Sequence, residues 1–379
     1  MFHFTITHHD QSSSARTGLL HTPHGSIRTP AFIPVATQAA VKALSPAQIE
    51  EIGFEAVLCN TYHLYLRPGS KTVQKLGGLH RFMGWNKPIF TDSGGFQVFS
   101  LNDGLCTVND DGVEFKSHID QSKHLFTPEK SIQLQQQLGA DIIFTLDVCH
   151  DFNADYPTAK KAMERTHRWA ERCWKEFQRE NQKKGIVQAL YGIVQGGKFK
   201  DLREESARFI AKLPFQGIGL GSIFGEPKAP TLEVLKWMMA ILPHEKPKHL
   251  LGIGSVDDIF NYVELGVDTF DCVLPTRLAR VGYVFLRPES RGKVRNKFRT
   301  RITNARFKED KKPLDQHCGC YVCQNFSRAY IRHLFKAKEL LAYTLTTHHN
   351  LFFFQRLMQE IRESIENDAL GRMKKKWLK

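Results

Sequence analysis

Short apolar runs alternate with amphipathic segments over most of the chain. The amphipathic segments repeat their apolar residues at helical spacing, for example at 159–178 and 202–212. The apolar runs are short and rich in β-branched and aromatic residues, as strands are, and there are eight of them: 31–35, 56–59, 88–91, 141–146, 189–194, 217–220, 249–253 and 269–273. This order predicts an α/β protein with a (β/α)8 TIM barrel. A doubly wound open sheet would give the same pattern, so the pattern alone does not exclude it.

The two ends of the chain depart from this rhythm. Residues 2–30 alternate weakly around Gly18 and Gly25, which predicts an N-terminal antiparallel β element, either a hairpin or a small sheet. From residue 281 onward a basic stretch leads into a cysteine cluster, and a helical pattern resumes at 326–345 and 351–366. We therefore predict two units. Residues 1–280 form the barrel with most of the active site, and residues 281–379 form a C-terminal unit packed on it.

The cysteine cluster predicts a metal site. Cys318, Cys320 and Cys323 all fall within one six-residue segment of a polar, lysine-rich stretch. His349 follows farther along the chain. Three thiolates and one imidazole complete a tetrahedral Zn²⁺ shell and leave no position for a water, so such a site is structural. His349 is preferred to His348 as the fourth ligand. The catalytic residues must therefore lie elsewhere.

Charge and cysteine usage indicate the partner and the compartment. The 379 residues carry a net charge of +14, and Lys and Arg cluster at 287–312 and 372–379. Such clusters favour a polyanionic partner over a merely solvated basic surface. The other cysteines are scattered singly through apolar sequence, as free thiols in a reducing compartment are. With no signal-peptide pattern and no apolar run long enough to cross a bilayer, a cytoplasmic protein without a membrane segment is expected.

Polar residues and glycines follow or end the predicted strands. They are Asp92, Asp147, Gln195, Gly221, Gly252, Gly254 and Asp271. In a barrel these positions converge on the C-terminal rim, where active sites of this fold lie. The two carboxylates Asp92 and Asp271 are candidates for a nucleophile and a general acid/base, as used to break and remake a glycosidic bond. For Asp141 and Asp258 a helix N-cap is the preferred interpretation.

Several motifs together resemble those of bacterial tRNA-guanine transglycosylase. They are Asp-Ser-Gly-Gly-Phe-Gln-Val-Phe-Ser at 92–100, Val-Gln-Gly-Gly at 194–197, Phe-Asp-Cys-Val-Leu-Pro-Thr-Arg at 270–277, and Pro-Leu-Asp at 313–315 before the cysteine cluster. Each motif is weak alone, but the set in this order is specific and covers nearly the whole chain. The resemblance implies an irregular (β/α)8 barrel with a zinc-binding subdomain. It also implies exchange of guanine at the wobble position of certain tRNAs for a free 7-deazaguanine base.

The resemblance assigns roles to individual residues. Asp271 corresponds to the nucleophile that attacks the ribose C1′ and forms a covalent ester, and Asp92 to the general acid/base. The residues implied to bind the base are Asp147, Gln195, Gly221, Phe96, Cys149, Ser222, Leu251 and Gly252. Those expected to contact the RNA are Arg277, Arg280, Lys293 and Arg295. A homodimer is also implied, as is flipping of the wobble nucleotide out of its stack.

The chain departs from the usual bacterial motifs along one side of this pocket. It reads Asp-Val-Cys-His-Asp-Phe at 147–152 and Leu-Gly-Ser-Ile-Phe-Gly-Glu at 220–226. Both segments line the side expected to face the 7-substituent, so two bases remain open. Cys149 and Glu226 favour prequeuosine base, whereas Ser222, Ile223 and Phe224 leave queuine as the alternative.

Two functions from other classes are disfavoured. A metal-dependent barrel hydrolase would need His and carboxylate ligands at several strand ends, and this chain has Asp, Gln and Gly there. A non-catalytic RNA-binding partner subunit would not need both Asp92 and Asp271.

Overall fold

Eight parallel strands close into a barrel, which confirms the predicted fold and excludes the open sheet. The computed structural model describes residues 2–379 except 101–105, 185–186 and 223–227. Each strand pairs with the strands before and after it, and β14 pairs with β4 to close the ring. The strands are β4 (Ala31–Ala36), β5 (Val57–Cys59), β6 (Ile89–Thr91), β10 (Ile142–Phe144), β11 (Ala189–Val194), β12 (Gly217–Leu220), β13 (Lys248–Leu250) and β14 (Thr269–Cys272).

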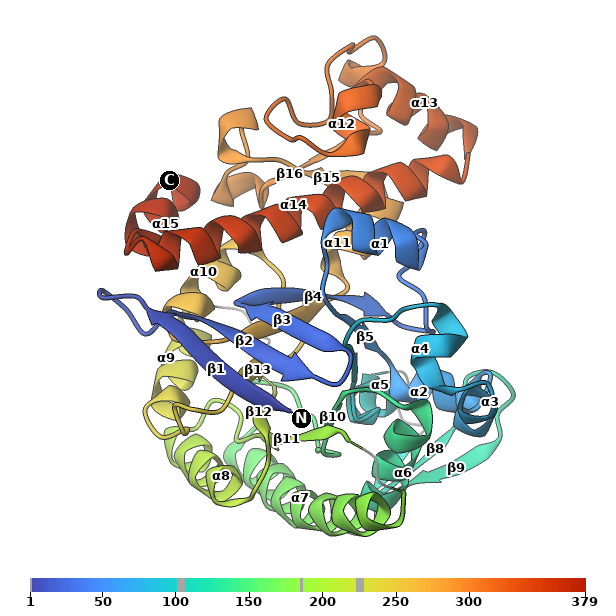
Figure 1. Ribbon diagram of the computed structural model, residues 1–379, viewed down its shortest axis with the longest axis vertical. Coiled ribbons are helices and arrows are strands. Elements are labelled where there is room, and N and C mark those ends of the chain that lie inside the picture. The colour runs from blue at the N-terminus through green and yellow to red at the C-terminus, as the bar shows by residue number, and fades with distance from the viewer. Residues whose placement is uncertain (1, 101–105, 185–186, 223–227) are drawn as a thin grey trace.

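Helices cover the outside of the barrel (Figure 1). Buried apolar faces on these helices pack against the outward side chains of the strands and form the largest core of the protein. The helices before the C-terminal unit are α1 (Pro46–Ile52), α2 (Thr61–Leu66), α3 (Ser70–Lys75), α4 (Gly78–Met83), α5 (Gly95–Ser100), α6 (Pro128–Leu138), α7 (Tyr156–Lys184), α8 (Lys200–Lys212), α9 (Lys228–Met239), α10 (Val256–Glu264) and α11 (Leu274–Arg280). No described helix combines the length and apolar character that a membrane span requires.

The predicted N-terminal element is a three-stranded antiparallel sheet that covers one end of the barrel. It consists of β1 (His3–His9), β2 (Arg16–Thr22) and β3 (Gly25–Thr29). Leu20 and Ile27 share a buried cluster with residues inside the barrel, including Ala56 and Ala189 near the strand beginnings. The sheet therefore closes the amino end of the barrel and leaves the carboxyl end for a site.

Two aspartates that were interpreted as helix N-caps have other positions. Asp141 lies before β10, where its carboxylate accepts hydrogen bonds from the Ile89 N–H and pairs with His24 and His80. The interpretation of Asp141 was wrong, because its partners come from the N-terminal sheet, from α4 and from β6. At α10 the N-cap is Ser255, and Asp258 is the third helical residue. The Asp258 side chain accepts a hydrogen bond from the Ser255 hydroxyl, so it supports the same helix start.

A second antiparallel sheet was not predicted. It is inserted between β6 and β10 and consists of β7 (Cys106–Val108), β8 (Val113–Lys116) and β9 (Lys123–Phe126). Val113 and Phe115 alternate with exposed residues and face the core. His118, in the connection between β8 and β9, reaches the pocket described below.

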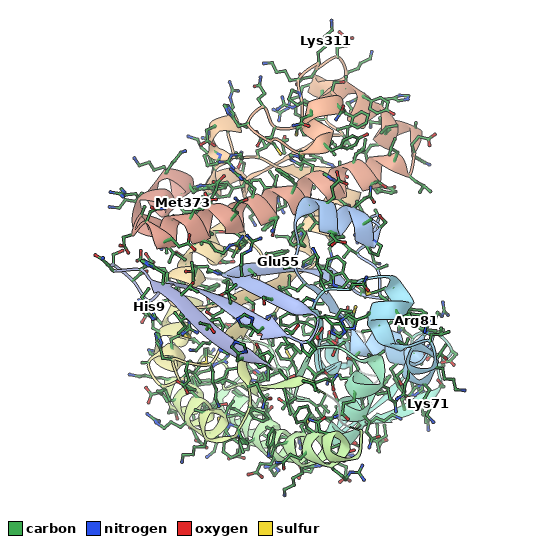
Figure 2. The ribbon with its side chains drawn as sticks, in the orientation of Figure 1. His9, Glu55, Lys71, Arg81, Lys311 and Met373 are labelled. Atoms are coloured by element: carbon green, nitrogen blue, oxygen red, sulfur yellow. The ribbon has the colours of Figure 1, made fainter. Side chains whose placement is uncertain are left out.

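The C-terminal unit has a small core of its own. Its elements are β15 (Tyr283–Phe285), β16 (Arg299–Arg301), three short 3-10 helices at Pro288–Ser290, Val294–Asn296 and Ala305–Phe307, α12 (Tyr321–Asn325), α13 (Arg328–Ala337), α14 (Leu341–Glu366) and α15 (Leu370–Leu378). Its core includes Val284, Ile302 and Leu314. Figure 2 shows Lys311 at the end of this unit farthest from the barrel. A division of the chain at residue 280 stays a prediction.

Helix α14 joins the C-terminal unit to the barrel. It packs against α1, α11 and β4 on one side and against α12 and α13 on the other (Figure 1). Two helices with a break at 346–350 were predicted, and this was wrong. The helix is continuous through the polar run at 346–350, and the chain breaks earlier, between α13 and α14.

Candidate active site and metal centre

A pocket of about 740 Å³ opens at the carboxyl ends of the barrel strands. Of the residues predicted to act on the substrate, those that line it are Asp92, Phe96, Asp147, Cys149, Gly221, Ser222, Leu251, Gly252, Asp271, Arg277 and Arg280. Gln195 is fully buried behind this lining. Lys293 and Arg295 are exposed on the surface of the C-terminal unit, outside the pocket.

Asp271, near the end of β14, is held through one carboxylate oxygen. The His249 Nε2 lies 3.1 Å from Asp271 Oδ1, and the Gly252 N–H donates to the same oxygen at 3.0 Å. His249 is fully buried, and its Nδ1 lies 2.9 Å from the Thr269 hydroxyl. The second oxygen of Asp271 makes neither of these contacts. A carboxylate fixed in this way is oriented as a nucleophile must be.

Asp92, directly after β6, is surrounded by hydrogen-bond donors. The Thr61 N–H donates to Oδ1 at 2.8 Å, and the side-chain amides of Asn60 and Gln97 donate to Oδ2. Burial raises the pKa of Asp92 to about 6, although these donors oppose the rise. The negative charge of Asp271 adds to it. A carboxyl group with this pKa can both give and take a proton near neutral pH.

The glycines after Asp92 allow neighbouring segments of the protein to pack closely against the backbone. Gly94 has a φ of +85°, and a Cβ there would lie 3.0 Å from the Phe126 ring. A Cβ at Gly95 would lie 3.0 Å from the Asp147 carbonyl oxygen. The nearest neighbours of the two glycines therefore include the inserted sheet and the loop after β10.

Asp147 and Gln195 form a buried pair at the bottom of the pocket. The Gln195 Nε2 donates to Asp147 Oδ2 at 2.7 Å, and Ser93 donates to Oδ1 at 3.4 Å. Burial raises the pKa of Asp147 to about 6. Gly221 lies against this pair, because a Cβ at Gly221 would be 2.6 Å from Gln195 Nε2. The buried Gln195 Oε1 has no hydrogen-bond partner among the described residues.

The side of the pocket between β10 and β12 is formed by Cys149 and Ser222. Their Sγ and Oγ atoms are 3.4 Å apart, and Ser222 adopts a left-handed backbone with a φ of 51°. Burial raises the pKa of the Cys149 thiol to about 12. This thiol is therefore neutral and lines the pocket without acting as a nucleophile. Ile223, Phe224 and Glu226, which were expected to continue this wall, lie outside the described residues.

The rim of the pocket combines apolar and cationic side chains. Phe96 is 49% exposed at the edge, and Leu251 is half-buried in the lining. Arg277 and Arg280 lie on α11, which begins directly after β14. Both arginines line the same pocket as Asp271, where a polyanion could approach.

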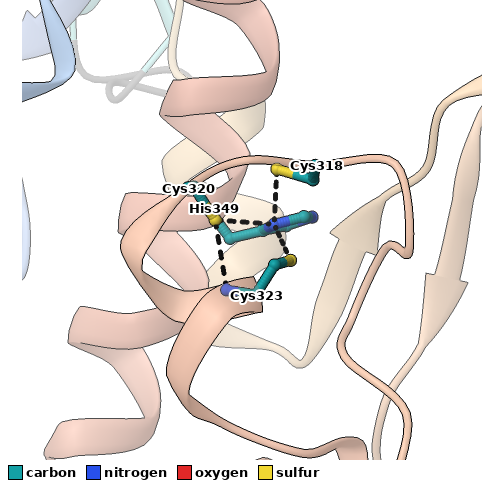
Figure 3. Close-up of side chains that lie close together, drawn as sticks. All are labelled: Cys318, Cys320, Cys323 and His349. Carbon is teal, nitrogen blue, oxygen red and sulfur yellow. Dashed lines mark hydrogen bonds between the residues drawn. The ribbon is translucent and has the colours of Figure 1, made fainter.

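The predicted metal ligands come together in the C-terminal unit. The sulfurs of Cys318, Cys320 and Cys323 lie 3.8, 3.5 and 3.3 Å from His349 Nδ1, as Figure 3 shows. Tetrahedral bonds of about 2.3 Å to sulfur and 2.0–2.1 Å to nitrogen would separate these atoms by about 3.6 Å. The His349 Nε2 lies 2.8 Å from the Phe285 carbonyl oxygen, a contact that fixes the ring with Nδ1 toward the sulfurs. This group can hold a metal ion, and it uses His349 and not His348.

The chain is similar to known proteins over nearly its whole length. The family model for queuine tRNA-ribosyltransferase matches residues 10–379. The chain is 50% identical over 377 residues to the queuine tRNA-ribosyltransferase of Caldanaerobacter subterraneus subsp. tengcongensis, which covers 99% of this chain and 96% of that protein. It is 51% identical over 371 residues to the enzyme of the same name from Thermoanaerobacter pseudethanolicus, covering 98% of this chain and 95% of that protein.

The chain belongs to the queuine tRNA-ribosyltransferase family. Enzymes of this family are pentosyltransferases that act on tRNA, so the predicted transferase class is confirmed. The resemblance noted from the motifs is confirmed as well.

Several residues of the pocket were missed by sequence reasoning. They are Asn60 and Gln97, which hold Asp92, His249, which holds Asp271, and Lys42, His63 and His118 in the lining. Asn60 directly follows β5, so the rule that located Asp92 after β6 could have found it. His118 lies in the connection between β8 and β9 of the inserted sheet, which the strand pattern did not predict.

Proposed function

We propose that this enzyme exchanges guanine at the wobble position of tRNA for a free 7-deazaguanine base by two displacements at the ribose C1′. The observation that carries the proposal is the shared pocket of Asp92 and Asp271, with the Asp147–Gln195 pair below them. Two carboxylates with separate hydrogen-bond partners are what covalent exchange at a glycosidic carbon requires.

In the first displacement, a carboxylate oxygen of Asp271 attacks C1′ as the bond from C1′ to the guanine nitrogen breaks. Asp92 gives its proton to the departing guanine. In the second displacement, the incoming base loses a proton to Asp92 and attacks C1′, and the ester bond to Asp271 breaks. Each step inverts C1′, so the β configuration is restored.

The base is recognised by groups that would stay unpaired without it. Asp147 in its ionised form accepts hydrogen bonds from N–H groups of the guanine-like edge. Gln195 and the backbone of Gly221 contact the same end of the base, and Phe96 and Leu251 cover its two faces. Polar groups left unpaired in such a pocket cost about 1–3 kcal/mol each, which rejects bases with another edge.

The tRNA approaches over the cationic rim. Arg277 and Arg280 contact the phosphates next to the flipped nucleotide, and Lys293 and Arg295 contact phosphates farther along. Such contacts position the strand without reading its sequence. A homodimer, which rests on the resemblance, and a cytoplasmic location, which rests on the single free cysteines and is where tRNA is used, complete the proposal.

The metal in the C-terminal unit is proposed to be zinc, bound by Cys318, Cys320, Cys323 and His349. Zinc binds such a ligand set as a closed structural site. It stabilises the unit that carries Lys293 and Arg295 and takes no part in the displacements.

We favour prequeuosine base as the incoming base and keep queuine as the alternative. The two differ only at position 7, so selectivity depends on the residues facing that substituent. Cys149 and Ser222 are the described part of this wall. Exchange assays with each base in turn, on the same unmodified tRNA, discriminate between them.

The test of the mechanism is covalent trapping. Wild type incubated with unmodified tRNA should give a denaturation-resistant adduct, and Asp271→Asn should bind tRNA without forming it, because an amide is a far poorer nucleophile. Asp151→Asn is the matched control, since Asp151 is an exposed carboxylate on the loop beside the pocket. It should keep the adduct. An adduct in Asp271→Asn would overturn the assignment, and a wild type that binds tRNA without ever forming an adduct would support the non-catalytic partner subunit instead.

A further inference from the structure

Arg203 is a fully buried cation behind the base pocket. It lies in the first turns of α8 and has no exposed surface. Its guanidinium donates to the carbonyl oxygens of Gly197 at 2.7 Å, Gly221 at 2.9 Å and Ser222 at 3.0 Å. A longer contact of 3.3 Å reaches the Val194 carbonyl oxygen.

This position is costly for a charged group. None of these hydrogen bonds goes to a carboxylate, and burial lowers the pKa of Arg203 to about 9. The side chain also belongs to the beginning of a helix, where the partial charge of the helix dipole is positive and disfavours a cation. Burying an ion without an opposite charge is unfavourable unless hydrogen bonds replace its hydration. The carbonyl oxygens around Arg203 supply that replacement.

The carbonyl groups belong to the two loops that form the base-binding end of the pocket. Val194 ends β11 and Gly197 lies in the loop after it, so the two residues flank Gln195, and Gly221 and Ser222 follow β12. One planar guanidinium therefore ties both loops together at fixed spacing. Glycine at position 196 lets the first loop lie close to the start of α8, because a Cβ there would lie 2.8 Å from the Arg203 backbone nitrogen.

Helix α8 fixes the first of these loops through a second residue as well. The Gln195 N–H donates to the Ser206 hydroxyl at 3.1 Å, and this hydroxyl lies 3.0 Å from His167 Nε2. Ser206 holds the Gln195 backbone only, whereas Arg203 contacts both loops.

We propose that Arg203 is a positioning residue for the base pocket, which sets the spacing between Gln195 and the Gly221–Ser222 peptide. The inference rests on the proposed function, in which those groups bind the base. The planar guanidinium has five N–H donors and can hold carbonyl groups of both loops at once, whereas the compact ammonium of a lysine would replace these contacts only in part. Loss of the fork lets the loops separate, and both guanine and the incoming base then bind more weakly. Binding of tRNA over the rim is unaffected.

The experiment measures exchange of labelled guanine into unmodified tRNA by wild type, Arg203→Met and Arg203→Lys. We expect KM for guanine to rise about tenfold or more in Arg203→Met, with a smaller rise in Arg203→Lys. KM for tRNA should stay within about twofold of wild type, since rim contacts set it. The matched control is Arg362→Met. Arg362 is also a buried arginine that donates to a backbone carbonyl, but its acceptor Pro30 precedes β4 at the opposite end of the barrel.

The outcomes separate a positioning role from general stability. A loss of folded protein lowers the amount of active enzyme and leaves KM for guanine unchanged, which is the result expected for Arg362→Met. The same result for Arg203→Met would overturn the inference. If Arg203→Met does not fold, KM for guanine in Arg203→Lys decides, and an unchanged value there overturns it. A wild type that exchanges no guanine contradicts the proposed function itself.

Discussion

His249 Nε2 lies 3.1 Å from Asp271 Oδ1, inside the barrel and out of contact with solvent. The Thr269 hydroxyl lies against the other ring nitrogen, so the ring can hold a proton on Nε2 and donate it to the carboxylate. Phe90 and Phe144 pack against the ring and hold it in place. Asp271 thus receives two donors on one oxygen, and its orientation depends on a residue that never touches the substrate.

We expect His249→Phe to slow formation of the covalent adduct about tenfold, because a carboxylate held by the Gly252 N–H alone loses part of the alignment that attack requires. KM for guanine should change little, since His249 lies on the nucleophile side of the pocket. His249→Gln is the control, because its amide can restore an N–H donor in a similar volume. The measurement is single-turnover adduct formation. Equal rates for wild type and His249→Phe would show that the Gly252 N–H alone orients Asp271.

The first displacement is expected to slow as the pH rises through 6. The pKa of Asp92 is raised to about 6 by burial, and only the protonated form can give a proton to the departing guanine. Single-turnover release of guanine from tRNA, followed from about pH 5 to pH 8, should therefore fall toward the alkaline side. Asp92→Asn should be slow throughout. A wild-type rate that stays constant or rises over this range would exclude Asp92 as the acid.

Recognition of the free base should weaken as the pH falls, which is the opposite pH dependence. The pKa of Asp147 is also raised to about 6 by burial, and only the ionised form accepts hydrogen bonds with both oxygens. We therefore expect KM for guanine to rise as the pH falls below 6, while Asp147→Asn shows a high KM that does not vary with pH. If KM in wild type stays the same from pH 5 to pH 8, Asp147 does not read the base as a carboxylate.

The barrel could be predicted from sequence because buried parallel strands are continuous apolar runs. The residues at which the strands end could not be predicted in this way. The run at 141–146 is paired only over Ile142–Phe144, because Leu146 is buried in a loop and apolar character does not show where pairing stops. The inserted sheet was missed because its strands are short and half exposed.

Helix α14 shows how buried polar residues mislead a pattern. The polar run at 346–350 predicted a break, yet Thr346, His349 and Asn350 are held by polar contacts within the fold in place of water. Thr346 donates to the Ala342 carbonyl, and Asn350 donates to the Pro275 and Tyr283 carbonyls and accepts from the Phe285 N–H. His349 faces the cysteines. Apart from the Ala342 carbonyl within α14 itself, these partners are tertiary and distant in sequence, and they overrode the local signal.

The pocket residues at the ends of strands could be predicted from the sequence. The buried residues that hold them in place could not. Asp92, Asp147 and Asp271 occupy positions that the barrel makes functional, and their motifs are specific. Arg203 and His249 carry no such signal, because an arginine in an amphipathic helix usually faces solvent and a histidine in a strand usually packs in the core. Only the three-dimensional structure shows that their partners are a pair of loops and the carboxylate of Asp271.

The metal site gives the last prediction. Cys320→Ala should lower bound metal and thermal stability together, because a structural metal contributes its binding free energy to folding and three remaining ligands hold it weakly. Cys173→Ala is the matched control, since Cys173 is an equally buried thiol outside the cluster. It should keep full metal content, and any loss of stability there measures thiol removal alone. Metal analysis and thermal unfolding, each with and without a chelator, check both variants. Chelation should lower the Tm of wild type and of Cys173→Ala toward that of Cys320→Ala, which should itself change little. Full metal occupancy in Cys320→Ala with an unchanged Tm would show that the four residues pack together without serving as a metal centre.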